Sequence, residues 1–541
     1  MEHTKAIFLI SSLLLLQAVT LKSQILQTDL ISSDTTWSSD TVRIYNDILL
    51  EYPATLSINP GVYLEFQGDY SIEVQGKILA LGTEEYPITF TVSDTNGFSN
   101  ISINAGGWGG IKLLDNSVDT SYFSFCNFSF GKACDTLNQN DRIASESLKG
   151  GAIYANGYAN ILIENCVFSN NMAYHSGGAI MAVNLHNLFI SNSLFDNNRV
   201  LEYGGALWLN NIEQTVISKN IFNENKAIKF RETAGGTAIS GAGAAMWLGA
   251  QTSNSFIISN FITNNISLDA AFYETNYKCK VFNNIIVNNR GPGMIIGHSA
   301  SISLYNNNTI VHNKGFFHNM CGILFFSPNI TMRNNIVYGN TSDYYGFDPI
   351  QVYSPDPVIA DFAYSCNPDE PVYYQGEGNI HEDPQFVNPT SGAGPDYDGL
   401  SADWSLLDSS PCVNTGTPDT TGLNLPTTDL LGNPRIFGIR VDMGAIENQM
   451  VVGLPPNPQV NARIQVSPNP FGQSFKVIAP NDKKISSISL FNQNGQQIAT
   501  ETMMPFEQML VFDLRNQSPG LYLLVTRFAD GSTETTKLVK Y

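Results

Sequence analysis

The feature that most constrains the fold is a four-residue phrase that recurs at one fixed interval. Gly-Gly-Ala-Ile begins at residues 150 and 177, and Gly-Gly-Ala-Leu begins at residue 204, so that successive copies are 27 residues apart. A second phrase, Phe-x-x-Asn, keeps the same step from Phe168 through Phe195 to Phe222. A shared period between 20 and 50 residues is typical of stacked structural units. The sequence therefore predicts a solenoid in which each repeat forms one turn.

The repeats contain short β-branched runs rather than helical patterns. Runs such as 161–163 and 215–217 are separated by Gly and Asn, and no helical period is sustained. Looser copies follow: the Ala-Ala-Met-Trp phrase at 244–247 comes after a 12-residue insertion, and Asn-rich phrases begin at 284, 308 and 335. We therefore predict an all-β chain folded as a right-handed parallel β-helix, a pectate-lyase-like solenoid with rungs about 4.8 Å apart. We expect it to occupy residues 24–377, with its first regular rung near residue 35.

Composition and the N-terminus indicate where the protein works. The formal net charge of −20 disfavours nucleic acid and anionic membrane surfaces as partners. Residues 1–23 combine Lys5 with apolar runs at 6–10 and 13–16, which is the pattern of a secretory signal peptide. No later stretch reaches about 18 apolar residues, so we expect no transmembrane segment after signal removal.

The seven cysteines are widely spaced and include no Cys-x-x-Cys pair, so we expect neither a metal site nor a cofactor. Cys126 and Cys166 lie in strand-like phrases and are expected to be buried thiols that act as small apolar side chains. Cys366 and Cys412 form the one pair for which a disulfide is worth testing.

One outward-facing column is the candidate ligand surface. If Ile153 and its equivalents point inward, alternation along each strand sends the next residue outward. The resulting column is Tyr154, Met181, Trp208 and Trp247, continuing through Ile295 and Leu324. We predict that Tyr154, Trp208 and Trp247 bind the apolar faces of sugar rings or an apolar partner surface. The alternative is that the insertions at 127–149 or 228–243 fold over this face and bury it.

The evidence for catalysis is weaker. Catalytic β-helices need stacked acids or bases, yet Glu202 aligns with His175, and the three regular repeats contain no column of carboxylates. The candidate acids or bases are His175, His186, His298 and His312, for which a solvated turn is the alternative, and an acid-rich and aromatic-rich loop at 341–377. We therefore expect no enzyme activity and assign no catalytic residue. A polysaccharide lyase or glycoside hydrolase acting on an acidic polysaccharide is the alternative, and a purely structural surface role is a third.

The C-terminal third resembles known segments of exported proteins. Residues 378–447, with Glu-Asp-Pro-Gln-Phe-Val-Asn at 382, Trp404 and Val-Asp-Met-Gly-Ala-Ile-Glu at 441, resemble the choice-of-anchor Q segment that follows β-helices. A Pro-rich linker at 448–462 leads to residues 463–541, which resemble the sorting domain of the type IX secretion system. The resemblance implies a small β-sandwich, a Bacteroidetes-type cell, recognition by type IX secretion machinery and attachment to surface lipopolysaccharide.

The repeated phrases at about 150–265 also resemble those of chlamydial polymorphic outer-membrane proteins, and this resemblance implies adhesion. Gly corners, Phe interiors and stacked Asn side chains explain the same phrases as rung geometry. Taken together, the sequence predicts a secreted, cell-surface-anchored β-helix that binds glycan or acts as an adhesin.

Overall fold

The computed structural model describes most of the chain in two compact units, residues 1–450 and 451–541. The described residues are 23–26, 29–116, 118–134, 148–233, 236–249, 252–275, 278–297, 302–316, 319–327, 329–344, 346–354, 361–369, 376–449, 464–469, 471–478, 485–492, 497–501, 509–518, 520–528 and 533–540. The predicted signal peptide, except for Ser23, and most of the predicted linker lie outside them.

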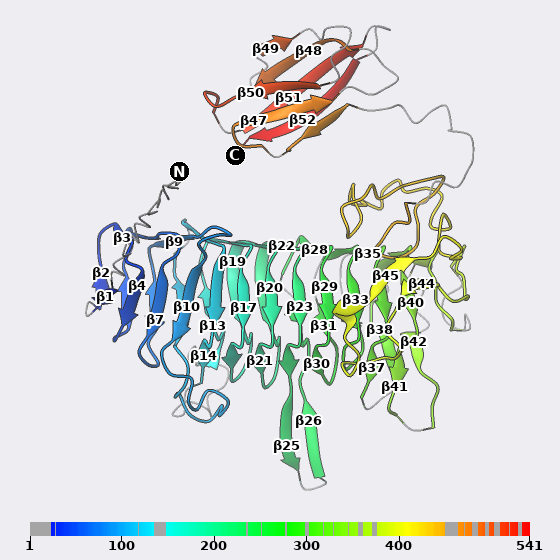
Figure 1. Ribbon diagram of the computed structural model, residues 1–541. Coiled ribbons are helices and arrows are strands. Elements are labelled where there is room, and N and C mark those ends of the chain that lie inside the picture. The colour runs from blue at the N-terminus through cyan, green and yellow to red at the C-terminus, as the bar shows by residue number, and fades with distance from the viewer. Residues whose placement is uncertain are drawn as a thin grey trace, which may run out of the picture. The chain divides into compact units, whose positions relative to one another are not determined.

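The first unit is the predicted parallel β-helix (Figure 1), and its widest sheet contains two strand ladders that share β19 and β22. We call them ladders A and B. Ladder A consists of β2 (Leu30–Ile31), β5 (Ile48–Leu50), β8 (Ile72–Val74), β11 (Ile111–Leu114), β15 (Ile153–Asn156), β19 (Ile180–Ser191), β22 (Leu207–Ser218), β27 (Met246–Leu248), β31 (Phe272–Glu274), β34 (Met294–Ile296), β38 (Met320–Phe325) and β42 (Ile350–Tyr353). Ladder B consists of β3 (Thr35–Trp37), β6 (Thr55–Ile58), β9 (Lys77–Leu81), β12 (Thr120–Ser124), β16 (Asn160–Glu164), β19, β22, β28 (Ser255–Ile258), β32 (Lys280–Phe282), β35 (Ser303–Asn306), β39 (Ile330–Arg333) and β43 (Asp361–Ala363).

A second long ladder runs along the whole solenoid, and a shorter third side is present on some of its rungs. Ladder C contains β1 (Ser23–Leu26), β4 (Thr41–Ile44), β7 (Tyr63–Phe66), β10 (Ile88–Val92), β13 (Cys126–Ser129), β17 (Val167–Ser169), β20 (Leu194–Asp196), β23 (Ile221–Asn223), β29 (Phe261–Thr263), β33 (Ile285–Val287), β36 (Thr309–Val311) and β40 (Ile336–Tyr338). Ladder D contains β14 (Lys132–Ala133), β18 (Met172–Ala173), β21 (Arg199–Val200), β24 (Lys226–Ala227) and β30 (Ile266–Ser267), and β37 (Lys314–Gly315) pairs separately with β41 (Thr341–Ser342). Because β1 already pairs with β4, parallel pairing starts before residue 35.

The Phe-x-x-Asn phrase forms two interior stacks, as predicted. The rings of Phe168, Phe195 and Phe222 are fully buried and stack at 4.9 Å between centroids. A buried asparagine ladder links neighbouring rungs through Nδ2–Oδ1 hydrogen bonds of 2.8–2.9 Å, and it runs through Asn171, Asn198, Asn225, Asn265, Asn289 and Asn313. These bonds satisfy buried amides and hold the rungs in register.

The Gly-Gly phrase forms the corner that precedes each strand of ladder A. Gly177 and Gly204 have φ of +67° and +70°, where a side chain would be strained. A Cβ on Gly178 would lie 2.1 Å from the carbonyl oxygen of Gly205 on the next rung. The phrase is therefore explained by backbone geometry alone.

Residues 378–447 pack against the side of the solenoid rather than adding regular rungs. They contain β44 (Phe386–Asn388), a 3₁₀ turn at Gly399–Ser401 and β45 (Asp403–Leu406). Trp404 and Met443 share a core with Ile285, Val311 and Ile336, which lie on ladder C. We call residues 378–447 the wrap.

The second unit has two antiparallel sheets, which agrees with the predicted sandwich. One sheet contains β46 (Gln465–Ser467), β47 (Ser474–Ile478) and β50 (Met509–Asp513), and the other contains β49 (Gln497–Glu501), β48 (Ile485–Asn492), β51 (Gly520–Phe528) and β52 (Thr533–Lys540). Phe475 of the first sheet and Leu524 of the second belong to one buried core.

Candidate functional site

The outward column predicted from strand alternation is present on ladder A. The register aligns Tyr154 with Met181, Met181 with Trp208, and Trp208 with Trp247. The same column continues through Tyr273, Ile295, Leu324 and Tyr353. One file of large apolar side chains thus runs along the outer face of the ladder.

Burial varies along this column. Tyr154 and Met181 are 4% and 5% exposed, and Ile295 and Leu324 are 4% and 7% exposed. Trp208, Trp247 and Tyr273, which lie between these covered ends, are only half-buried. We call these three residues the aromatic window.

The rings of the aromatic window stack along the solenoid axis. The indoles of Trp208 and Trp247 have centroids 5.1 Å apart and planes within 3°, and Tyr273 follows at 6.3 Å and 14°. Two indoles that lay side by side in one plane would overlap at a centroid separation of 5.1 Å. The two parallel indoles must therefore lie face to face. Their edges, rather than their faces, therefore point away from the stack. Neither indole N–H has a partner among the described residues, which leaves both donors available.

The position two residues beyond each ring carries a small or polar side chain. Asn210 follows Trp208, Gly249 follows Trp247 and Thr275 follows Tyr273. A Cβ on Gly249 would lie 2.8 Å from Cζ3 of Trp247 and 2.2 Å from Oδ1 of Asn210. The indole of Trp247 thus occupies space that any other residue at position 249 would fill.

Tyr203, in the corner before β22, stands beside the window. It is 40% exposed, and its ring lies 6.1 Å from the Trp247 ring at an interplanar angle of 42°. Within the window itself, burial raises the pKa of the Tyr273 hydroxyl, and the nearby Asp269 raises it further. The tilted ring of Tyr203 gives the window a side wall with an accessible face.

A charged cluster adjoins Tyr203. Nε2 of His175 lies 3.5 Å from Oε2 of Glu202, and Lys229 forms a second ion pair with Glu202. The ring of His175 also contacts Tyr203 edge to face at 6.1 Å. The 27-residue spacing that aligned His175 with Glu202 in the sequence therefore corresponds to a contact between adjacent rungs.

Two insertions, at 127–149 and 228–243, were the predicted alternatives for covering this face. The insertion at 228–243 forms a hairpin of β25 (Lys229–Thr233) and β26 (Gly236–Ser240) that extends away from the solenoid body (Figure 1). Trp208 and Trp247, on the rungs before and after this hairpin, remain partly exposed. Of the other insertion, at 127–149, residues 135–147 lie outside the described residues.

The remaining candidate residues lie elsewhere. His186 of β19 pairs with Glu213 of β22 at 3.1 Å, in the exposed part of these strands between ladders A and B. His312 is covered by the wrap, where it contacts Trp404 edge to face at 5.3 Å, and burial lowers its pKa. His298 and parts of the 341–377 loop lie outside the described residues. Among the described residues, no three His, Cys, Asp or Glu side chains are grouped to hold a metal ion.

Two members of the site were missed in the sequence. Ala-Ala-Phe-Tyr at 270–273 repeats Ala-Ala-Met-Trp at 244–247, so extending the phrase by one copy would have found Tyr273. Tyr203 immediately precedes a Gly-Gly pair, and this position carries Ser176 and Lys149 on the preceding rungs. No aromatic residue therefore recurs at this position, and the repeat gave no signal for Tyr203.

The family comparison identifies the C-terminal unit. Residues 465–541 match the model for the secretion system C-terminal sorting domain. They are a type IX sorting domain. This domain is recognised by type IX secretion machinery, so the protein is exported through the outer membrane to the cell surface or beyond. No curated protein is similar enough to count as a match. In the described part of the chain, no helix is long and apolar enough to cross a membrane.

Proposed function

We propose that this protein is a non-enzymatic, surface-displayed solenoid that binds glycans on a host or neighbouring cell through the aromatic window. The observation that carries the proposal is the half-buried stack of Trp208, Trp247 and Tyr273 in an exported protein. Its outward edges, with two available indole N–H donors, suit hydrogen bonding to sugar hydroxyls. Tyr203 adds an accessible ring face, which suits the apolar face of a pyranose.

The stacking changes which contacts a ligand would make. Because the indole faces are turned toward one another, a sugar ring would lie against Tyr203 and across the edges of the stack. Asn210 and Thr275 lie beside these edges and add polar groups for hydroxyls. Tyr154 is almost fully buried, so its proposed part is to support Met181 and the end of the stack.

A glycan array tests this proposal. The full-length protein should bind a defined set of glycans, and the double variant Trp208→Ala/Trp247→Ala should lose about tenfold or more in affinity for them. Phe189→Ala is the matched control, because Phe189 is also a half-buried outward ring on the same sheet but lies on ladder B. Unchanged binding by the double variant, or no binding by the wild type, would contradict the proposal.

The second candidate function is a polysaccharide lyase or glycoside hydrolase, and the cluster of His175, Glu202 and Tyr203 favours it. A histidine paired with a carboxylate beside a tyrosine supplies groups that can transfer protons. However, Lys229 also pairs with Glu202, which offsets its negative charge. Incubation with pectin, alginate and chondroitin distinguishes the two functions, because only an enzyme releases new reducing ends or unsaturated uronates.

A further inference from the structure

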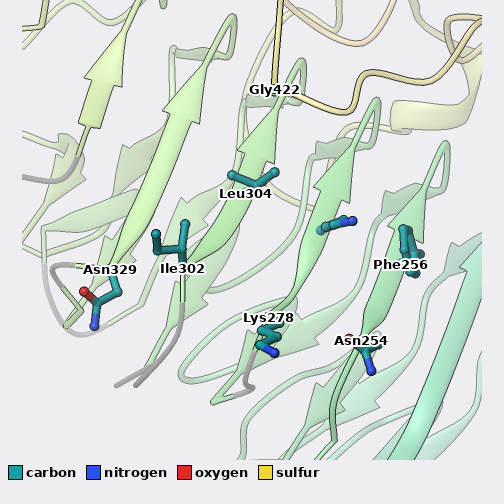
Figure 2. Close-up of a pocket in the computed structure, with 8 residues that line it drawn as sticks. Asn254, Phe256, Lys278, Ile302, Leu304, Asn329 and Gly422 are labelled. Atoms are coloured by element: carbon teal, nitrogen blue, oxygen red, sulfur yellow. The ribbon is translucent and has the colours of Figure 1, made fainter.

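A groove of about 660 Å³ lies on ladder B, on rungs beyond the aromatic window. Its floor and sides come from four consecutive rungs, those of β28, β32, β35 and β39, and from the wrap at Gly422 (Figure 2). Gly422 has φ of +80°, and a Cβ there would meet nothing within 4 Å. The wrap therefore borders the groove without filling it.

The groove is lined by two columns of outward-facing side chains. The register places Phe256 next to Lys280 and Lys280 next to Leu304. Two residues earlier on the same rungs lie Asn254, Lys278 and Ile302, and the last of these is 68% exposed. Rungs about 4.8 Å apart give the apolar floor room for one or two sugar rings.

The two lysines make this groove locally positive in a chain of net charge −20. The Lys280 ammonium lies 4.6 Å from the centroid of the Phe256 ring, a cation–π contact that holds the charge over the floor. Lys278 is exposed, and neither lysine forms an ion pair with a described carboxylate. None of the described residues that line the groove is acidic.

The backbone at Lys278 is also unusual. Its φ is +60°, in the left-handed region where asparagine is preferred, and the equivalent residue one rung earlier is Asn254 with φ of +48°. A lysine at this position thus replaces the residue type that the backbone favours.

We propose that this groove binds an acidic saccharide, with the apolar face of a sugar ring on Ile302 and Leu304 and its carboxylate between Lys278 and Lys280. The apolar floor and paired cations match a ligand that carries both features on one ring. An extended peptide fits less well, because the strands beneath the groove are hydrogen-bonded on both sides and offer no free sheet edge. This site is separate from the aromatic window and does not depend on it.

Calorimetry with the full-length protein tests the proposal. An oligogalacturonate should bind, and the same oligosaccharide with its carboxyl groups reduced to alcohols should bind roughly tenfold more weakly or not at all. Lys278→Met/Lys280→Met should cause a similar loss, whereas Lys278→Arg/Lys280→Arg should retain binding. Affinity should also fall as salt is raised, because the lysines are partly exposed.

The matched control is Lys219→Met. Lys219 is exposed, has φ of +57° and lies outside the groove, so its substitution should leave binding unchanged. Trp208→Ala/Trp247→Ala should also leave oligogalacturonate binding unchanged, which separates this site from the proposed function. The proposal is overturned if no oligogalacturonate binds, if the reduced sugar binds equally well, if the Lys278→Met/Lys280→Met variant still binds, or if only a phosphorylated lipopolysaccharide core oligosaccharide is bound.

Discussion

The indole of Trp208 lies face to face with that of Trp247, although the two residues are 39 positions apart and a projecting hairpin lies between them. The stack therefore depends on the rung register and not on the length of the connection. The edge of the Trp247 ring borders a position that holds only Gly249.

Gly249→Ala should disturb the aromatic window without unfolding the solenoid. The new Cβ would lie 2.8 Å from the Trp247 ring and 2.2 Å from Asn210, so the indole must move. We expect a changed near-ultraviolet circular dichroism signal from the stacked indoles and weaker glycan binding. Gly68→Ala is the control, since its Cβ would meet only the Tyr70 ring at 3.3 Å. An unchanged spectrum for Gly249→Ala would show that the ring does not occupy this space.

Asn225→Ala should be among the most destabilising substitutions in the solenoid. Asn225 donates to Asn265 and to the Phe195 carbonyl at 2.9 Å, and its Oδ1 accepts from the main chain and side chain of Asn198. Loss of these bonds leaves buried polar groups unpaired, at a cost of about 3–5 kcal/mol in the free energy of unfolding. Denaturant unfolding of the full chain measures this.

The control for that substitution is Asn223→Ala. Asn223 belongs to the same rung but faces outward, where it donates to Asp196 at 2.7 Å and is partly exposed. Its loss should cost about 1 kcal/mol or less, because water can replace the bond. Equal losses for the two variants would argue against the interior ladder as a main source of stability.

The sequence was most informative where a physical requirement repeats. The left-handed corners at Gly177 and Gly204, the interior stack of Phe195 and the asparagine ladder each recur at one period, so the solenoid could be predicted. Alternation along the strands also predicted the column through Trp208 and Trp247 correctly, and the register confirms it.

Features made by segments from different parts of the chain were not predictable in the same way. The exposure of the column changes from the buried Tyr154 and Ile295 to the half-buried Trp208, and the repeat alone does not predict this change. The groove at Lys278 needs two columns of different composition and a border from the wrap. A signal for the wrap did exist, because Ile285–Val287 is apolar on both faces of its strand, as a doubly covered strand must be.

The attachment of the wrap should weaken as the pH rises from about 4 to 7. Burial raises the pKa of Glu447 from 4.5 to about 7 and that of Asp442 from 3.8 to about 6, and it outweighs the opposing effect of Arg435, whose Nη2 lies 2.5 Å from Glu447. The folded wrap therefore holds these protons more tightly than the unfolded chain does. This contribution to stability is complete below pH 4 and is lost as the pH passes through the folded pKa values.

Hydrogen exchange of the wrap as a function of pH measures that loss. Protection should fall between pH 4 and 7 in the wild type, and Glu447→Gln should flatten the profile because it removes the carboxyl with the largest shift. Asp408→Asn is a suitable control, since Asp408 is exposed. Protection that increases over this range would contradict the prediction.

Cys366 and Cys412 should cross-link when the protein is oxidised. All seven cysteines are buried free thiols here, and the interaction of the Cys366 thiol with that of Cys412, together with burial, raises the pKa of Cys366 well above the usual value. Thiol–disulfide exchange with oxidised glutathione would join the two sulfurs and release two molecules of reduced glutathione. Peptide mapping without reduction should detect the linked peptides, and Cys412→Ser should abolish them. A map in which both peptides remain separate after oxidation would show that the two segments cannot reach disulfide geometry.

The asparagine ladder passes without interruption through rungs of 24, 27 and 40 residues. The pitch is thus fixed inside the solenoid, while extra chain leaves at the corner between ladders D and A. Natural variation at this corner can change what the cell displays while the supporting framework stays the same. The same property makes the β25–β26 hairpin a natural place to graft a foreign peptide for display on a bacterial surface.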